Sequence, residues 1–285
     1  MIPENFEYNA PANLQEALGM LSSQGAKPLA GGMSLIPLMK LRLASPERLV
    51  DLGRLSDLSY IREDQDSIRI GATTTHQQIE SSALLRSKCP LLAGTASHIG
   101  DVQVRNMGTI GGSIAHADPA ADYPAALLAL DAQVHLVTAK SKRTIAIGEF
   151  LVDTFTTALA PGEIVQEVIV PEETSGIGYS YQKLVQPASG FAIVGIAVRL
   201  RKTGDKISLA RIGITGLAHK AFRATAVEKA LEGTAGTDAD LQKAAASLAD
   251  VEEINSDLHA SAEYRRHMAI VYTGRALRVA LSRMT

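Results

Sequence analysis

Two short glycine pairs, each beside a hydroxyl side chain, are the residues of this sequence with the clearest capacity for binding chemistry. The first is Gly31-Gly32-Met33-Ser34 and the second is Thr109-Ile110-Gly111-Gly112-Ser113. Glycines let the backbone turn sharply and let its N–H groups approach a ligand without an intervening Cβ. Successive exposed amides form a concave electropositive nest that suits a phosphate or pyrophosphate. One such turn is commonly structural, but two of them could grip a dinucleotide pyrophosphate from both sides.

Polar residues follow the second glycine pair at spacings that permit several kinds of chemistry. Asp122, nine residues after Ser113, could accept hydrogen bonds from a ribityl chain or a sugar. Asp118 and His116 could form an acid–base pair or a metal site. A simpler interpretation is that Asp118 begins a turn and that Asp122 caps a helix or holds a ligand hydroxyl. The sequence has no Walker loop, nucleophile elbow or His-Glu-x-x-His motif, so reactivity would belong mainly to a bound cofactor.

The composition is that of a folded protein with ordinary charge. The chain has 285 residues, with 46% hydrophobic and 20% charged residues, and is long enough for roughly two or three domains. A net charge of −2 argues against a nucleic-acid surface. No apolar run approaches the roughly 18–20 residues of a membrane span, and the first residues lack the order of a secretory signal, so we expect a cytoplasmic protein. The single cysteine, Cys89, excludes an intrachain disulfide or a four-thiolate cluster supplied by this chain alone, and we expect it to be buried or semi-buried.

The elements that would position the two glycine pairs follow from the spacing of apolar residues. Residues 13–24 are spaced as an amphipathic helix with Asn13 as N-cap. A short strand runs into the first glycine pair, and an apolar turn follows it. A helical stretch begins near residue 73 and carries His76, which we expect at the surface or in a capping role. The other elements expected before the second pair are strands over 27–30, 49–52 and 67–72 and a buried helix over 90–99.

The rest of the chain divides at one clear linker, residues 171–176, which is rich in Pro, Glu, Ser and Gly. Before it we expect a short helix over 124–130 and strands over 133–138, 144–147 and 164–170. After it we expect a small antiparallel sheet of strands over 178–184, 192–200 and 207–216. Three helices follow, over 224–231, 238–249 and roughly 260–282.

Together, the two glycine pairs resemble the two flavin loops in the FAD-binding medium subunits of molybdenum hydroxylases, the xanthine dehydrogenase family. The first likeness runs through Ala30-Gly31-Gly32-Met33-Ser34-Leu35-Ile36-Pro37, with Lys40, Arg42 and Leu43 and then Leu49-Val50-Asp51-Leu52. The second runs through Thr109-Ile110-Gly111-Gly112-Ser113 with Asp118-Pro119-Ala120 and Asp122. Both motifs occur in the right order and at the right separation, and the likeness covers nearly the whole chain.

The resemblance implies an α+β fold. It consists of the two-subdomain FAD-binding fold of the vanillyl-alcohol-oxidase (PCMH) type, followed by a C-terminal domain with a small antiparallel sheet and helices. The expected boundaries are residues 1–56 for the first FAD-binding subdomain, 57–173 for the second and 174–285 for the C-terminal medium-subunit domain.

The resemblance also implies a set of cofactor-binding residues, with no catalytic residue and no metal ligand in this chain. Asp122 would bind the ribityl side of the FAD, and Lys183 would lie near the isoalloxazine ring. Phe191 stands where the family often has tyrosine, so it can shield the flavin but cannot donate a hydrogen bond to it. Ile99 and Ile164 match positions that pack on the cofactor. Backbone amides would hold the pyrophosphate, from Ala30, Gly31, Gly32, Met33 and Ser34 and from Thr109, Ile110, Gly111, Gly112 and Ser113.

Met33 departs from the family pattern, which has a polar residue, often histidine, at this place. A side-chain hydrogen bond to FAD is therefore not expected there. Methionine also supplies no nucleophile for a covalent flavin link, so the FAD should be bound non-covalently.

The function implied is electron relay by the FAD subunit of a heterotrimeric molybdenum hydroxylase, with the carbon monoxide dehydrogenase type favoured. Substrate would be oxidised at a molybdopterin cofactor in a large partner chain. Electrons would pass through two [2Fe-2S] clusters of a small partner chain to this FAD and then to an external acceptor. The trimer is expected to be doubled into an (αβγ)2 heterohexamer. The alternatives are a self-sufficient flavin-dependent reductase or oxidase of the same fold, and a non-enzymatic interaction protein that has lost the cofactor.

Overall fold

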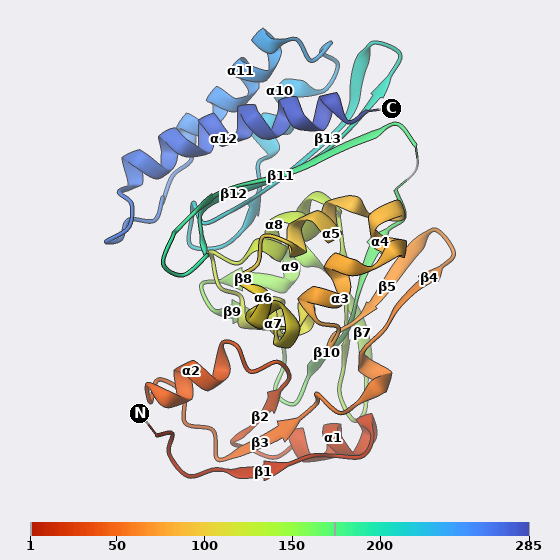
Figure 1. Ribbon diagram of the computed structural model, residues 1–285, viewed down its shortest axis with the longest axis vertical. Helices are drawn as coiled ribbons and strands as arrows, with labels where there is room; N and C mark the ends of the chain where they lie inside the picture. Colours follow the sequence, from red (N-terminus) through yellow and green to blue (C-terminus); the bar gives the residue numbers. More distant parts are fainter. Residues whose placement is uncertain (1, 174, 285) are drawn as a thin grey trace.

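A three-stranded sheet forms the N-terminal end of the protein (Figure 1). The structure is a computed structural model and describes residues 2–173 and 175–284. Strand β3 (Arg48–Asp51) lies between β1 (Glu7–Asn9) and β2 (Ala26–Leu29), and both pairings are parallel. Helix α1 (Leu14–Leu21) ends before the predicted residue 24, but the predicted cap is confirmed, because the Asn13 side chain accepts a hydrogen bond from the Glu16 amide at 2.9 Å. Helix α2 (Leu35–Lys40) leaves the first glycine pair.

The central unit is a five-stranded antiparallel sheet with helices on one side. Its strand order is β4-β5-β10-β6-β7, and side chains of β5 and β10 such as Ile68, Ile70 and Val168 are fully buried. The strands are β4 (Ile61–Asp64), β5 (Ser67–Gly71), β6 (Gln133–Val137), β7 (Lys142–Ala146) and β10 (Ile164–Pro171). The helices between β5 and β6 are α3 (His76–Ser81), α4 (Ala83–Lys88), α5 (Pro90–Ala96), α6 (Val102–Met107), α7 (Ile110–His116) and α8 (Asp122–Ala129). Smaller elements are η1 (Ser56–Leu58), α9 (Ile147–Phe150), β8 (Leu151–Asp153) and β9 (Thr156–Thr157).

Helix α8 lies at the centre of the molecule, and every one of its residues is buried. It contacts α5 on one side and strands β12 and β13 of the next sheet on the other. The approach is very close at Gly213, where an added Cβ would lie 2.0 Å from the Ala125 carbonyl oxygen. The Ala-rich sequence of α8 therefore serves close packing between two layers.

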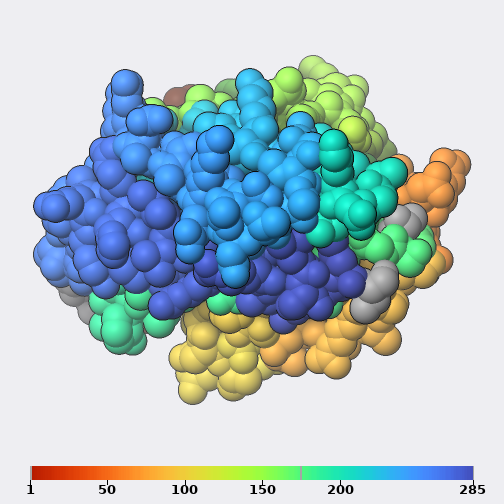
Figure 2. Space-filling view, turned by 90° about the horizontal axis from the view of Figure 1, so that it is seen from above, coloured from red at the N-terminus to blue at the C-terminus, as the bar shows by residue number. Residues whose placement is uncertain are grey.

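The C-terminal unit is an antiparallel sheet, as the sequence predicts, in the order β11-β12-β13-β14. Its strands are β11 (Ile177–Val185), β12 (Ala192–Thr203), β13 (Lys206–Thr215) and β14 (Phe222–Arg223). Helices cover the face opposite α8, namely α10 (Thr225–Leu231), α11 (Asp238–Ala246), η2 (Ser247–Asp250) and α12 (Ala262–Ser282). Figure 2 shows these C-terminal segments, in blue, spread across that end of the molecule. The helix predicted over 238–249 thus ends early and continues as a 3-10 turn.

The three larger sheets draw their strands from separate stretches of the chain, residues 7–51, 61–171 and 177–223. The domain boundaries after residues 56 and 173 remain a prediction, and Thr174, where the third domain would begin, lies outside the described residues. Among the residues that the structure describes, no helix is long and apolar enough to cross a membrane.

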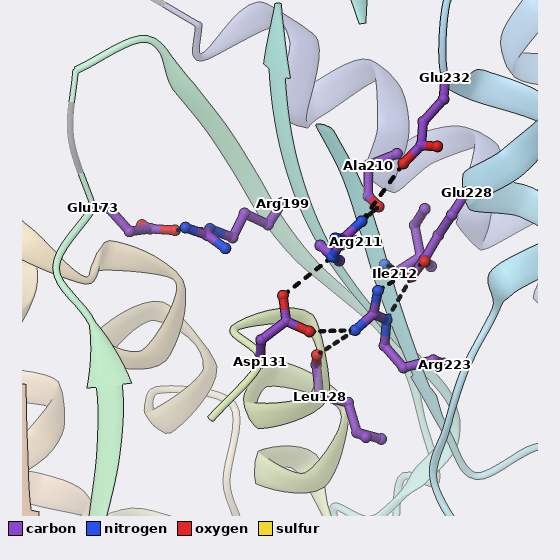
Figure 3. A network of polar contacts seen from close by, with 10 residues as sticks. All are labelled: Leu128, Asp131, Glu173, Arg199, Ala210, Arg211, Ile212, Arg223, Glu228 and Glu232. Atoms are coloured by element: carbon purple, nitrogen blue, oxygen red, sulfur yellow. Dashed lines mark hydrogen bonds and ion pairs between the residues drawn. The ribbon is translucent and has the colours of Figure 1, made fainter. Parts of the chain in front are cut away.

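Charged side chains join the central unit to the C-terminal sheet (Figure 3). Asp131, just after α8, accepts hydrogen bonds from Arg211 on β13 and from Arg223 on β14. Arg223 also binds both carboxylate oxygens of Glu228 at 2.6 and 2.7 Å. Glu228 is 5% exposed and also accepts a hydrogen bond from the Ile212 amide. Arg223 is therefore the counter-ion of a buried carboxylate.

A second charged pair lies at the linker. The side chains of Glu173 and of Arg199 on β12 are only 4% and 10% exposed, with Arg199 Nε 3.2 Å from Glu173 Oε1 (Figure 3). Burial raises the pKa of Glu173 to about 7, and the neighbouring arginine acts in the opposite direction. This pair fixes the linker to the sheet that follows it.

Replacement of Arg223 by methionine should lower the free energy of unfolding by about 3 kcal/mol, because it leaves the Glu228 carboxylate buried without a counter-ion. Arg278→Met is a matched control, since its pair with Asp238 is exposed and should contribute less than about 1 kcal/mol. Urea denaturation of the two variants measures the difference. Equal losses would show that Arg223 has no special role between the layers.

Candidate functional site

One large cavity, of about 1230 Å³, lies where the N-terminal, central and C-terminal units meet. It exceeds the roughly 300–1,000 Å³ of a typical small-molecule pocket. All the predicted site residues line it except Ile110 and Lys183. The structure therefore brings together two loops that are more than 70 residues apart in the sequence.

The first glycine pair presents a row of free amides to this cavity. Residues 30–34 connect β2 to α2, and Gly32 has a φ of +72°, which an L side chain would adopt only with strain. Within the part of the chain that the structure describes, none of the five backbone N–H groups of residues 30–34 donates a hydrogen bond. Backbone amides are normally paired, so a row of unpaired amides forms a nest that suits acceptor oxygens such as those of a pyrophosphate.

The second glycine pair is built differently, because it forms the first turn of helix α7. Thr109 is the N-cap, and its Oγ1 accepts the Gly112 amide at 3.1 Å. The Ile110 and Gly111 amides donate to the carbonyls of Thr74 and Ala72, and the Ser113 amide donates to Thr109. Four of the five amides of residues 109–113 therefore donate hydrogen bonds within the protein, and among the described residues only the Thr109 amide makes none. Residues 72–74 accept two of these N–H groups, those of Ile110 and Gly111, and Thr109 accepts those of Gly112 and Ser113.

Glycine occupies the two positions in α7 for different structural reasons. A Cβ on Gly111 would lie 2.5 Å from the Ala72 Cβ, so this glycine permits close packing. A Cβ on Gly112 would approach only Thr109 Oγ1, at 2.9 Å, and Gly112 is exposed to the cavity. The Ser113 hydroxyl makes no hydrogen bond among the described residues. Gly112 and Ser113 are thus the parts of this turn that can still reach a ligand, and their contact with the cofactor remains a prediction.

Asp122 and Lys183 form a buried ion pair across the boundary between the units. Lys183 Nζ lies 2.9 Å from one carboxylate oxygen and 3.0 Å from the other, and it also donates to the His98 carbonyl. The Tyr181 hydroxyl donates to the same carboxylate. Burial raises the pKa of Asp122, while Lys183 and Tyr181 act in the opposite direction. Asp122 lines the cavity but does not cap α8, whose N-cap is Ala121.

Lys183 does not line the cavity. The suggested positions of Asp122 at the ribityl chain and of Lys183 near the flavin ring therefore remain predictions. What the geometry shows is that these two residues hold the turn at His98 against β11.

Sequence reasoning missed the role of His76. It was expected at the surface or as a cap, but it is 4% exposed, and the cap of α3 is Thr75. Its ring packs edge-on against Tyr123, with ring centroids 5.2 Å apart. Burial, helped by Arg105, lowers the pKa of His76 to about 4, so the ring is neutral at physiological pH. The three-residue spacing to buried Ile79 was the signal that could have placed it on the inner face of α3.

Arg105 supports the cavity wall from the outside. Its guanidinium donates to the carbonyls of Ile99 and Gly100 at 3.2 and 3.3 Å, and its Nε lies 2.9 Å from Glu80. The supported turn meets the β11–β12 hairpin, which carries Phe191 at 45% exposure. Phe191 and Ile99 therefore lie on adjoining walls of the cavity.

The two polar residues considered for acid–base chemistry have structural partners. Asp118 Oδ1 accepts the Ala120 amide at 2.8 Å, which confirms the predicted turn. His116 packs against Phe155, and burial lowers its pKa. Neither is paired with the other as a catalytic dyad, and no group of three or more metal-ligating side chains occurs in residues 2–173 and 175–284.

Cys89 is fully buried, as expected. Burial raises the pKa of its thiol well above the usual range. We therefore expect the folded protein to react with a disulfide reagent at pH 8 more than about tenfold more slowly than the unfolded chain, since one pKa unit changes the thiolate fraction tenfold. Rapid labelling of the native protein would show that this part of the core opens readily.

Comparisons with known proteins agree with this architecture. Residues 4–173 match the family described as "FAD binding domain in molybdopterin dehydrogenase", and residues 179–280 match "CO dehydrogenase flavoprotein C-terminal domain". The chain belongs to the family of FAD-binding medium subunits of molybdenum hydroxylases, and its relatives are oxidoreductases. The predicted family, fold class and enzyme class are thereby confirmed.

Individual relatives are similar over their full length. The carbon monoxide dehydrogenase medium chain of Hydrogenophaga pseudoflava is 40% identical over 285 residues, covering 99% of both chains. The glyceraldehyde dehydrogenase medium chain of Sulfolobus acidocaldarius is 39% identical over 281 residues, covering 98% of this chain and 99% of the relative. A solved structure of carbon monoxide dehydrogenase from H. pseudoflava, in a form lacking the Mo-pyranopterin moiety, matches with a TM-score of 0.96 and 42% identity over the whole of both chains.

The residues present fit an FAD. The free amides of residues 30–34 suit its pyrophosphate, Gly112 leaves room beside Thr109, and Ile99, Ile164 and Phe191 give the cavity apolar walls. Bound FAD would supply electron acceptance and release, and the protein's own residues bind and orient it.

Proposed function

We propose that this chain is the electron-transfer subunit of a heterotrimeric molybdenum hydroxylase of the carbon monoxide dehydrogenase type. It receives electrons from the [2Fe-2S] clusters of a small partner chain and passes them through FAD to an external acceptor. Substrate is oxidised at the molybdopterin cofactor of a large partner chain, and the trimer is doubled. The observation that carries the proposal is a dinucleotide-sized cavity bordered by the unpaired amides of residues 30–34, which suit a pyrophosphate.

Three titratable side chains of the cavity, those of His76, Asp118 and Asp122, support a relay and not a substrate site. A substrate acid or base must be free to exchange a proton near the operating pH. His76 is buried with a pKa of about 4, Asp118 bonds its own turn, and Asp122 is held by Lys183 and Tyr181. The chain's own residues therefore bind the flavin, orient it and exclude water.

Carbon monoxide is the favoured substrate of the whole complex, because several carbon monoxide dehydrogenase chains, 39–42% identical to this chain, match it over 99–100% of its length. Glyceraldehyde is the second candidate, on the strength of a relative at 39% identity. Assaying the assembled complex with both compounds decides between them. Substrate specificity would be determined by the large partner chain, where the substrate would bind.

Purification of the tagged chain from its native host tests the proposal. A small iron–sulfur chain and a much larger molybdenum chain should copurify with it in equal amounts. The self-sufficient flavin enzyme predicts instead that the isolated chain turns over a small substrate, and that result would overturn the proposal. The Gly112→Val variant addresses the non-enzymatic alternative. Its side chain would enter the cavity and should remove the flavin absorbance, whereas a protein without cofactor has no such band to lose.

A further inference from the structure

A buried arginine near the start of helix α12 binds backbone carbonyls of the neighbouring sheet. Arg265 is only 4% exposed, although the preceding residue, Tyr264, is exposed. Its Nη1 donates to the carbonyl oxygen of Ile193 at 2.6 Å and to that of Gly216 at 2.9 Å. Its Nη2 donates to Asp257 Oδ2 at 2.7 Å. Burial of a charged group is costly unless the group is paired and hydrogen-bonded, so these contacts hold the guanidinium in one place.

The two carbonyls that Arg265 binds lie where the pairing of two strands ends. The ladder between β12 and β13 stops at Thr215. Gly216 then has a φ of +79°, and an added Cβ there would lie 2.6 Å from the carbonyl oxygens of Ala192 and Ile193. The chain therefore turns away from the sheet while the two strand ends stay in close contact. Arg265 supplies hydrogen bonds just beyond the point where strand pairing stops, and buried carbonyls need such partners.

The same strand ends also hold the turn between α7 and α8, which lines the cofactor cavity. The amides of Gly216 and Ala192 donate to the carbonyls of Pro119 and Ala120, at 2.7 and 3.3 Å. The Thr215 hydroxyl lies 2.7 and 2.8 Å from two carbonyl oxygens of this turn. The position of this wall of the cavity therefore depends on how the ends of β12 and β13 are held.

Phe191, an aromatic residue of the cavity wall, comes directly before β12. Its carbonyl accepts the Gln186 amide at 2.9 Å, which closes the hairpin between β11 and β12. The Gln186 side chain lies 3.4 Å from His259 Nδ1, in the loop that also carries Asp257. Arg265 thus binds this hairpin two residues beyond Phe191, and the loop before α12 contacts the same hairpin.

We propose that Arg265, which does not line the cavity, is a positioning residue for the FAD site. It holds the Phe191 hairpin and the turn between α7 and α8 in one arrangement, because its guanidinium joins the strand ends to which both are attached. The inference rests on the proposed function, in which FAD occupies the cavity. A planar guanidinium donates in several fixed directions at once, whereas a lysine ammonium is a compact point charge. Without the guanidinium, the two walls can move independently and contact the cofactor less closely.

Titration of the purified full-length chain with FAD tests the proposal. In the Arg265→Met variant the dissociation constant for FAD should rise by more than about tenfold, since two carbonyls lose their charged donor. The visible circular dichroism of the bound flavin should also change, because it depends on the side chains around the ring. Both are measured well below the melting temperature, so that unfolding does not contribute. Arg266→Met is the matched control, because Arg266 bonds the Ala249 carbonyl away from the cavity, and it should change neither quantity.

Asp257→Asn is a second and milder variant. Asp257 Oδ1 accepts the amides of His259 and Ala260, whereas Oδ2 accepts Arg265. Asparagine can keep the first two hydrogen bonds through its oxygen while it turns an N–H group toward the guanidinium. The loop should therefore keep its shape while Arg265 loses one partner. We expect the dissociation constant for FAD to rise roughly threefold, as for the loss of one hydrogen bond.

The two variants separate positioning from stability. An Arg265→Met protein with a lower melting temperature but wild-type affinity for FAD and an unchanged flavin spectrum would overturn the proposal, because the arginine would then serve stability alone. If Arg265→Met does not fold, unchanged FAD affinity in Asp257→Asn would overturn it. A wild-type chain that bound no FAD would instead refute the proposed function.

Discussion

Gly31→Ala is expected to abolish FAD retention. A Cβ at this position would lie 2.0 Å from the Met107 carbonyl oxygen and 2.8 Å from the Gly108 Cα. Both contacts are with backbone, so the first glycine loop must move away from the second and the nest of free amides loses its shape. We expect affinity for FAD to fall more than about a hundredfold, which corresponds to the loss of about 2.7 kcal/mol. The ratio of flavin absorbance to protein after gel filtration measures it.

Gly19→Ala is the matched control for this experiment. Gly19 lies in α1, and an added Cβ there meets nothing within 4 Å. Alanine in a helix is more favourable than glycine by about 0.5–1 kcal/mol, so this variant should keep its FAD and become slightly more stable. A Gly31→Ala protein that retained a full complement of FAD would contradict the role given to the contact between the two loops.

Lys183→Met is the second substitution with a large expected effect. It leaves the Asp122 carboxylate buried with only Tyr181 as partner, and breaking a buried pair in this way costs about 3–5 kcal/mol. Because burial already raises the pKa of Asp122, loss of the lysine raises it further. Chemical denaturation at several pH values measures both effects.

The direction of the pH dependence follows from proton binding. An unfolded aspartate ionises near pH 3.9, whereas Asp122 in the folded variant keeps its proton to higher pH. The folded state then binds more protons than the unfolded state in this range, so the free energy of unfolding decreases as pH rises from about 4 toward the raised pKa. The Asp122→Asn/Lys183→Met double variant removes both charges and should be more stable at neutral pH than Lys183→Met alone. A double variant that loses the sum of the two single effects would show that the pair is not coupled.

The local sequence was sufficient to predict the features that depend on neighbouring residues. The Asn13 cap, the turn at Asp118 and the antiparallel C-terminal sheet all depend on short-range spacing, and all are present. The burial of Cys89 is likewise present. The two glycine pairs were recognised from their types and order, and the structure brings both to one cavity.

Features that depend on distant partners could not be predicted in this way. The amides of Ile110 and Gly111 donate hydrogen bonds to the carbonyls of residues 72–74. From the local sequence alone, the same amides would be expected to be free to bind an anion. Asp122 looks like a free ligand group in sequence, but its partners Tyr181 and Lys183 lie 59 and 61 positions away. Arg265 likewise binds carbonyls that lie 49 and 72 positions away.

The central claim is that electrons from substrate pass through the FAD held by this chain. Mixing substrate with the assembled complex in the absence of an external acceptor, and following the flavin absorbance, tests it most directly. We expect the flavin absorbance to be bleached in the wild-type complex. In the complex carrying Gly31→Ala, the iron–sulfur absorbance should still respond but turnover with an external acceptor should cease. Full turnover by the FAD-free complex, or a flavin band unaffected by substrate, would contradict it.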